Sequence, residues 1–134
     1  MLKLFVKILK KILSKNLKRS PYVKIAENVT TSGINLEIRK KVESKIYLEI
    51  GENSLVSGNF IFENEKGKIY IGKNTFIGKS DFISVEKIEI GDDVLISWGC
   101  TFMDNDAHSL ISEERKDDVL NWKKGLDEGC IGEY

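Results

Sequence analysis

The sequence is poor in residues that mark secreted, cross-linked or membrane-spanning proteins. Its two cysteines, Cys100 and Cys130, are 30 positions apart, which fits neither a zinc-ligand pair nor a small disulfide framework, so we expect a cytoplasmic protein. The 21 basic and 21 acidic residues cancel, which argues against a nucleic-acid partner. Lysine interrupts the N-terminal apolar sequence every three or four residues, so neither a signal peptide nor a membrane span is expected. The length of 134 residues suits one domain.

Charge is unevenly distributed along the chain. Eight basic residues precede the first acid, Glu27, which leaves 21 − 8 = 13 basic residues against 21 acidic ones after them. Residues 1–20 have a helical period and predict an amphipathic helix that ends near Lys18 or Arg19, because Pro21 disfavours helical geometry at Ser20. Its apolar face contains Leu2, Phe5, Val6, Leu9, Ile12, Leu13 and Leu17, and its opposite face contains Lys3, Lys7, Lys10, Lys11 and Lys18.

Two functions fit this helix equally well. It could lie on an anionic membrane surface, with its leucines in the interface and its lysines among the headgroups. Alternatively, it could cover the open end of the domain core, with its lysines in solvent. The pattern satisfies both.

Residues 21–108 contain an internal repeat. Four segments align without gaps: "IAENVTTSG", "IGENSLVSG", "IGKNTFIGK" and "IGDDVLISW". The first column is isoleucine, the second is alanine or glycine, and the fifth is small or β-branched. These columns contain Ile25, Ile50, Ile71 and Ile90, then Ala26, Gly51, Gly72 and Gly91, then Val29, Ser54, Thr75 and Val94. Six places after these isoleucines come Thr31, Val56, Ile77 and Ile96, so the pattern has a period of six residues.

A six-residue period predicts one flat side of a three-sided coil, in which stacked turns form parallel strands about 4.8 Å apart. The isoleucines would form an interior ladder, and glycine would occupy corners where the backbone leaves little room. Extra residues predict loops, the largest between Ile25 and Ile50 and another within "ENEKGKI". On the third side the gapless alignment groups Phe62, Ile83 and Phe102 in one column and Phe60, Asp81 and Cys100 in another. An antiparallel sheet would not place a small residue at the same offset in four units.

These repeats resemble those of the hexapeptide-repeat acyltransferases. The stretches "IGDDVLISWGCTFMDNDAHS" and "RKDDVLNWKKG" are most similar to sugar O-acetyltransferases of the maltose and galactoside type, especially those of bacterial surface-polysaccharide pathways. The resemblance implies an all-β, left-handed parallel β-helix, acetyl-coenzyme A as co-substrate, a sugar hydroxyl as acceptor, and a homotrimer with active sites between subunits. Left-handed winding would be an exception to the usual right-handed crossover.

The resemblance implies a catalytic role for His108. In the family a histidine at the start of a loop extruded from the coil faces the cleft between subunits. A neutral imidazole can remove the proton of a sugar hydroxyl as it attacks the thioester carbonyl. Coenzyme A is a good leaving group, so a covalent intermediate is unnecessary, and Cys100 is interpreted as a coil residue.

Several neighbours of His108 are candidates for orienting it or for binding the acceptor. Asp104, Asn105 and Asp106 immediately precede it, and either carboxylate could hold the imidazole in its useful tautomer; an Asx-rich turn is the alternative. Trp98 could stack on a sugar or cover the coil. Residues 109–134 are expected to form the extruded acceptor loop and tail, and Arg115 and Trp122 lie in the part that reaches over the acceptor in similar proteins.

The chain departs from the family at its C-terminal end. Similar enzymes continue with further coils that carry most of the coenzyme A groove, so the cofactor-binding residues are expected mostly beyond Tyr134. We therefore expect either a truncated piece of a longer enzyme or a non-enzymatic trimeric scaffold or inactive partner. A zinc hydratase on the same coil would need three histidines, and the chain has one, so no metal is expected.

Overall fold

Each sequence repeat folds into one turn of a parallel β-helix in the computed structural model. The structure describes residues 1–128, without the side chains of residues 10–15, 126 and 128, so Cys130 lies outside the described residues. The elements are α1 (Leu2–Lys18), β1 (Val23–Ile25), β2 (Thr30–Ile38), β3 (Leu48–Ile50), β4 (Leu55–Phe62), β5 (Ile69–Ile71), β6 (Phe76–Ser84), β7 (Ile88–Ile90), β8 (Leu95–Ile96), β9 (Thr101–Met103), α2 (Ser112–Arg115) and α3 (Asp118–Glu128).

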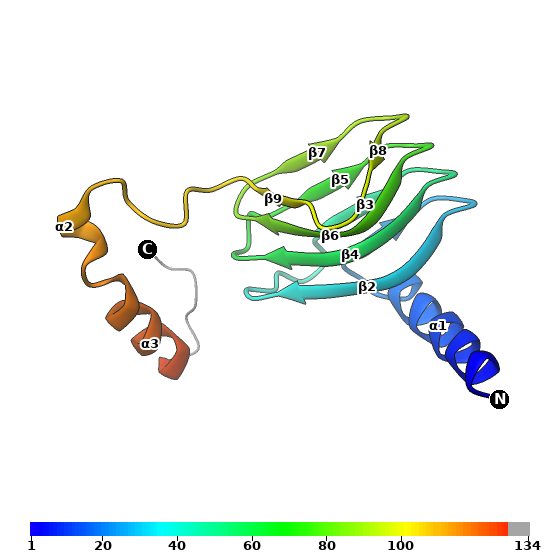
Figure 1. Cartoon of the computed structure of the whole chain (residues 1–134), viewed down its shortest axis with the longest axis horizontal. Coiled ribbons are helices and arrows are strands. Elements are labelled where there is room, and N and C mark those ends of the chain that lie inside the picture. The colour runs from blue at the N-terminus through cyan, green and yellow to red at the C-terminus, as the bar shows by residue number, and fades with distance from the viewer. Residues whose placement is uncertain (129–134) are drawn as a thin grey trace.

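The strands form two stacks of parallel neighbours. One sheet has the order β1-β3-β5-β7, and the other has the order β2-β4-β6-β8, with β9 also pairing with β6. Figure 1 shows β2, β4 and β6 running along the front of the coil and β3, β5 and β7 returning behind them as the chain rises, which is left-handed winding. The predicted fold class, a left-handed parallel β-helix with an N-terminal amphipathic helix, is confirmed.

The isoleucine column forms the predicted interior ladder. Ile25 pairs with Ile50, Ile50 with Ile71, and Ile71 with Ile90. Ile50 and Ile71 are buried between turns, whereas Ile25 in the first turn is half-buried. A side chain that is covered by the turns above and below it is removed most completely from water, so the core is most deeply buried in the inner turns.

The glycine column is explained by the close approach of successive turns. A Cβ placed at Gly72 would lie 2.5 Å from the carbonyl carbon of Gly91, and one at Gly51 would lie 2.7 Å from that of Gly72. Such contacts exclude any side chain. Gly91 belongs to the last turn, and no described atom lies within 4 Å of the position that its Cβ would take.

The small residues of the fifth column join the turns by hydrogen bonds. The Ser54 hydroxyl donates to the Gly72 carbonyl at 2.9 Å and accepts from the Thr75 amide at 3.0 Å. Thr75 repeats this pattern, with its hydroxyl donating to Gly91 O at 2.9 Å. These buried hydroxyls satisfy backbone groups that the corner would otherwise leave unpaired.

A further column of the repeat was not predicted from the sequence. The residues before the small column have left-handed backbone angles, which asparagine and aspartate tolerate better than other side chains because they can hydrogen-bond locally. These residues are Asn28, Asn53, Asn74 and Asp93, with φ between 52° and 58°. The recurrence of Asn or Asp at one position was the available signal.

On the third side of the coil the predicted register is wrong. Phe60 pairs with Phe82 rather than with Asp81, and Phe82 pairs with Phe102. The three rings stack along the interior, with centroids 4.9 Å and 4.8 Å apart. Asp81 points to the outer face, where its carboxylate accepts a hydrogen bond from Asn59 Nδ2. Pairing the rings keeps them in the core and the acid outside.

The register differs because the corner preceding this side takes a different number of residues in each turn. The β4–β6 pairing shifts between Val56 and Gly58, and Gly58 has φ of 136°. Only glycine adopts that angle readily, and a Cβ there would lie 2.1 Å from the Ser80 carbonyl oxygen. A gapless alignment cannot represent this bulge.

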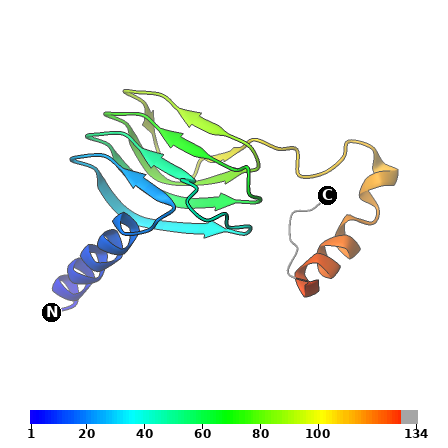
Figure 2. The same ribbon diagram turned by 180° about the vertical axis from the view of Figure 1, so that it is seen from behind.

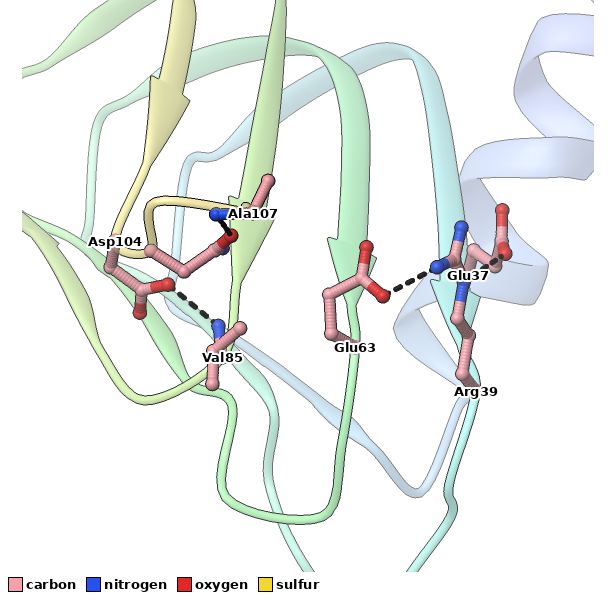
Figure 3. Close-up of polar contacts among 7 residues, drawn as sticks. Glu37, Arg39, Glu63, Val85, Asp104 and Ala107 are labelled. Atoms are coloured by element: carbon pink, nitrogen blue, oxygen red, sulfur yellow. Dashed lines mark hydrogen bonds and ion pairs between the residues drawn. The ribbon is translucent and has the colours of Figure 1, made fainter. Parts of the chain in front are cut away.

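The two largest predicted loops lie where expected, between β2 and β3 and between β4 and β5. Arg39, just after β2, forms an ion pair with Glu63, just after β4 (Figure 3). Its Nε also donates to Glu37 at 2.9 Å. Because the partners come from neighbouring turns, this pairing aligns the two loops on one edge of the coil.

Helix α1 ends at Lys18, as the position of Pro21 predicts. Leu17 packs against the core, whereas the first nine residues are exposed. Four side chains of the predicted faces lie outside the described ones, namely those of Ile12, Leu13, Lys10 and Lys11. Within residues 1–128 no helix has the length and apolar character that crossing a bilayer requires.

Candidate functional site

The candidate site begins where the chain leaves the coil, and Asp104 fixes that exit. Its carboxylate accepts a hydrogen bond from the Val85 amide at 2.7 Å (Figure 3). It also accepts from the Glu86 amide at 2.9 Å and from the Ser84 hydroxyl at 3.0 Å. Burial acts to raise the pKa of this carboxyl, but the hydrogen bonds outweigh it and hold the pKa below its ordinary value. Asp104 therefore anchors the exit to the corner after β6.

A tight turn follows and presents His108. Asn105 Oδ1 accepts a hydrogen bond from the Ala107 amide at 3.0 Å (Figure 3), and Ala107 has φ of 59°. The His108 amide then donates to Asp106 O at 2.6 Å. This Asx turn tightens the chain as it leaves the coil, and His108 follows it directly.

His108 meets two residues of α3. Its Nδ1 lies 2.6 Å from Asp118 Oδ2, and its ring centroid lies 5.1 Å from that of Trp122. Asp118 is the first residue of α3 and Trp122 comes one turn later, so both project from one face of the helix. The structure thus brings together a histidine, a carboxylate and an indole.

The geometry at Nδ1 determines what the imidazole can do. A carboxylate at this distance accepts the Nδ1 proton, which assigns the tautomer in which Nε2 carries the free lone pair. The His108 side chain is 39% exposed and that of Asp118 is 20% exposed, so the ring stays open to solvent while its orienting partner is largely covered. An imidazole that a carboxylate holds in this way is chemically able to accept a proton at Nε2.

The other predicted site residues lie elsewhere. Asp104 was a candidate to orient His108, but its carboxylate oxygens accept hydrogen bonds from the Ser84 hydroxyl and the Val85 amide of the coil. The Asp106 side chain is exposed, and its backbone carbonyl accepts from the His108 amide. Asn105 shapes the turn, and its Nδ2 is buried with no partner among the described atoms. Trp98 is 73% exposed and meets Phe76 edge to face, with centroids 6.5 Å apart.

Asp118 is the residue that the sequence analysis missed. The signal was its position at the start of a helical segment, four residues before Trp122, which places both side chains on one face. Residues 109–134 were expected to form a loop, and their described part contains the helices α2 and α3. Arg115, at the end of α2, is exposed.

Two further predictions concern cysteine and metal. Cys100 is half-buried in the coil, where its amide donates to Ser80 Oγ at 3.3 Å and its carbonyl accepts from the Asp81 amide at 2.8 Å, as expected for a coil residue. In the described part of the chain, no three His, Cys, Asp or Glu residues gather as metal ligands would.

The chain has a relative among known proteins. The chain is similar to an uncharacterized 24.8 kDa protein in the cps region of Klebsiella pneumoniae, with 26% identity over 143 aligned positions. The alignment covers 90% of this chain and 60% of that relative, so the chain spans less than two thirds of the relative's length. No family model matches the sequence. No solved structure matches it either.

Proposed function

We propose that this chain belongs to an acetyl-coenzyme A-dependent O-acetyltransferase that modifies a sugar hydroxyl during cell-surface glycan biosynthesis. The observation that carries the proposal is the His108–Asp118 pair, 2.6 Å apart, at the exit from the β-helix. Its support comes from the resemblance of the repeats to hexapeptide acyltransferases and from the relative's place in a cps region, a region of capsule polysaccharide.

The proposed reaction needs one base. His108 Nε2 takes the proton of the sugar hydroxyl as its oxygen attacks the thioester carbonyl of acetyl-coenzyme A. The tetrahedral oxyanion then collapses, the C–S bond breaks, and the thiolate leaves. The imidazolium returns its proton to the sulfur, which gives the acetyl ester and free coenzyme A. Asp118 stabilises the imidazolium in between.

The proposed assembly is a homotrimer. In enzymes that the chain resembles, clefts between neighbouring subunits bind acceptor and coenzyme A, and the exposed face of His108 is suited to such a cleft. Sedimentation equilibrium tests the trimer separately from the chemistry, and a strict monomer at micromolar concentration would contradict the shared site.

The test of the chemistry uses the complete natural protein with acetyl-coenzyme A and acceptor glycan from its own cell surface. Release of free thiol and the mass of the glycan report the transfer. His108→Ala should lower the rate by about two to four orders of magnitude, the usual contribution of a general base. A matched change, Asp117→Ala, removes a neighbouring carboxylate and should leave the rate unchanged.

Two outcomes would contradict the proposal. A loss smaller than about tenfold in His108→Ala would remove His108 as the base. Failure of the natural protein to bind acetyl-coenzyme A in calorimetry would favour the alternative, a non-enzymatic scaffold or inactive partner of the same fold.

A further inference from the structure

Residues 2–9 of helix α1 leave apolar side chains uncovered. Leu2, Phe5 and Leu9 lie on one side at helical spacing, and they are 77%, 60% and 42% exposed. Leucine and phenylalanine gathered on a helix in this way are normally buried, so a face of this kind marks a binding surface. The alternative that α1 covers the end of the core is contradicted for these residues.

Among the described side chains of α1, the one that packs against the coil lies near the C-terminal end of the helix. Leu17 packs against the core, and the Ser20 amide donates to Leu17 O at 3.1 Å. Figures 1 and 2 show the rest of α1 extending away from the first turn, with the N-terminus at the far end. The segment that carries His108 leaves the coil after β9, from the last turn. An occupant of the exposed α1 face therefore need not obstruct the candidate site.

Charge indicates what the occupant is. Residues 1–24 contain eight basic residues and no acid, a charge of +8, whereas residues 25–134 contain 13 basic and 21 acidic residues, a charge of 13 − 21 = −8. An anionic surface attracts the helix and repels the body, so it selects α1 as the contact. A protein groove would need both an apolar surface for the leucines and many acidic side chains for the lysines. An anionic bilayer provides apolar acyl chains and negative headgroups along the whole length of a helix.

We propose that α1 lies in the interface of an anionic membrane, with Leu2, Phe5 and Leu9 among the acyl chains and its lysines among the headgroups. This inference does not depend on acetyl transfer. Its consequence is that the coil is held at a membrane surface by its first turn, with the His108 segment leaving from the last turn.

The test is co-sedimentation of the complete protein with two kinds of vesicle, phosphatidylcholine alone and phosphatidylcholine with phosphatidylglycerol. We expect binding that requires the anionic lipid and weakens as salt rises. Phe5→Gln should weaken that binding by about ten- to a hundred-fold, because the ring no longer enters the interface.

Leu4 provides the matched control. It is 63% exposed, close to the 60% of Phe5, but it lies roughly 140° around the helix from Leu9 at 100° per residue. Leu4→Gln should therefore bind almost as well as the natural protein. Equal losses in the two variants would overturn the proposal, since they would show no preferred face.

Two other results would also overturn it. The first is absence of vesicle binding, or equal binding to neutral and anionic vesicles. The second concerns the oligomer. If the natural protein does not bind vesicles and Phe5→Gln has a lower oligomeric mass than it in sedimentation without lipid, the face is a contact between copies of the chain.

Discussion

The coil and the segment that carries His108 are held together in different ways. In the coil, a side chain's hydrogen-bond partner lies about one turn away: Ser54 reaches Gly72, 18 residues along the chain, and Ser80 reaches Ser97, 17 residues along. Beyond Asp104 the contacts are local, such as His108 with Asp118, ten residues away, and Ser109 with Glu114, five residues away. The coil's order is therefore collective, whereas the His108 segment depends on a few exposed contacts. Substitutions should accordingly change stability in the coil and chemistry in the segment.

The largest effect on stability is expected in the phenylalanine stack. Phe82 is fully buried between Phe60 and Phe102, so Phe82→Ala should lower the free energy of unfolding by about 3 to 5 kcal/mol in chemical denaturation. Phe102→Ala should cost clearly less, because its ring is half-buried and is the last of the stack among the described residues. Equal costs would mean that the last turn is as well covered as the one below it.

The next effect distinguishes two glycines of one column. Gly72→Ala should destabilise the fold by about 1 to 3 kcal/mol, because its Cβ would overlap the backbone of the next turn. The same change at Gly91 should stay within about 0.5 kcal/mol, since the described chain leaves that position open. Thermal unfolding of the two variants measures the difference. A large loss at Gly91 would show that something covers the last turn in solution.

A smaller effect is expected at Asp104, the boundary between the two regions. Asp104→Asn removes a charge that accepts three hydrogen bonds and should cost about 1 to 2 kcal/mol. Because the folded pKa lies below its ordinary value, the carboxylate's stabilisation is fully present above the aspartate range near pH 4 and is lost as pH falls through the lowered pKa.

Denaturation of the natural protein and Asp104→Asn over this acid range checks the sign. The natural protein should lose stability more steeply than the variant as the pH falls, so the two curves should converge at low pH. Parallel curves would exclude a lowered pKa at Asp104.

Asp118→Ala should have little effect on stability but a clear effect on chemistry. Asp118→Ala breaks a contact whose imidazole side is open to solvent, and it should change the free energy of unfolding by less than about 1 kcal/mol. The proposed acetyl transfer should nevertheless fall by at least about tenfold, because the imidazole loses the group that sets its tautomer. NMR of the ring nitrogens reports that tautomer directly, and Asp117→Ala is the control. Unchanged tautomer and rate in Asp118→Ala would remove its orienting role.

The repeats were sufficient to predict the β-helix and much of its core. Isoleucine, glycine and a small residue recur at constant offsets, and residues at constant offsets stack when strands run parallel, so the ladder from Ile25 to Ile90 follows from the sequence. The end of α1 was equally predictable, because proline restricts the residue before it whatever the rest of the fold does.

Tertiary structure alone decided the third side and the partner of His108. Phe60 follows Val56 by four residues, Phe82 follows Ile77 by five, and Phe102 follows Ile96 by six, so the rings stack only because each corner absorbs a different length of chain. Likewise, Asp118 reaches the imidazole because a turn and the short helix α2 bring the start of α3 back to His108, whereas Asp104, nearer in sequence, is held by backbone amides of the turn below. Sequence offsets determine contacts only where the backbone repeats, and neither the corners nor the His108 segment repeats.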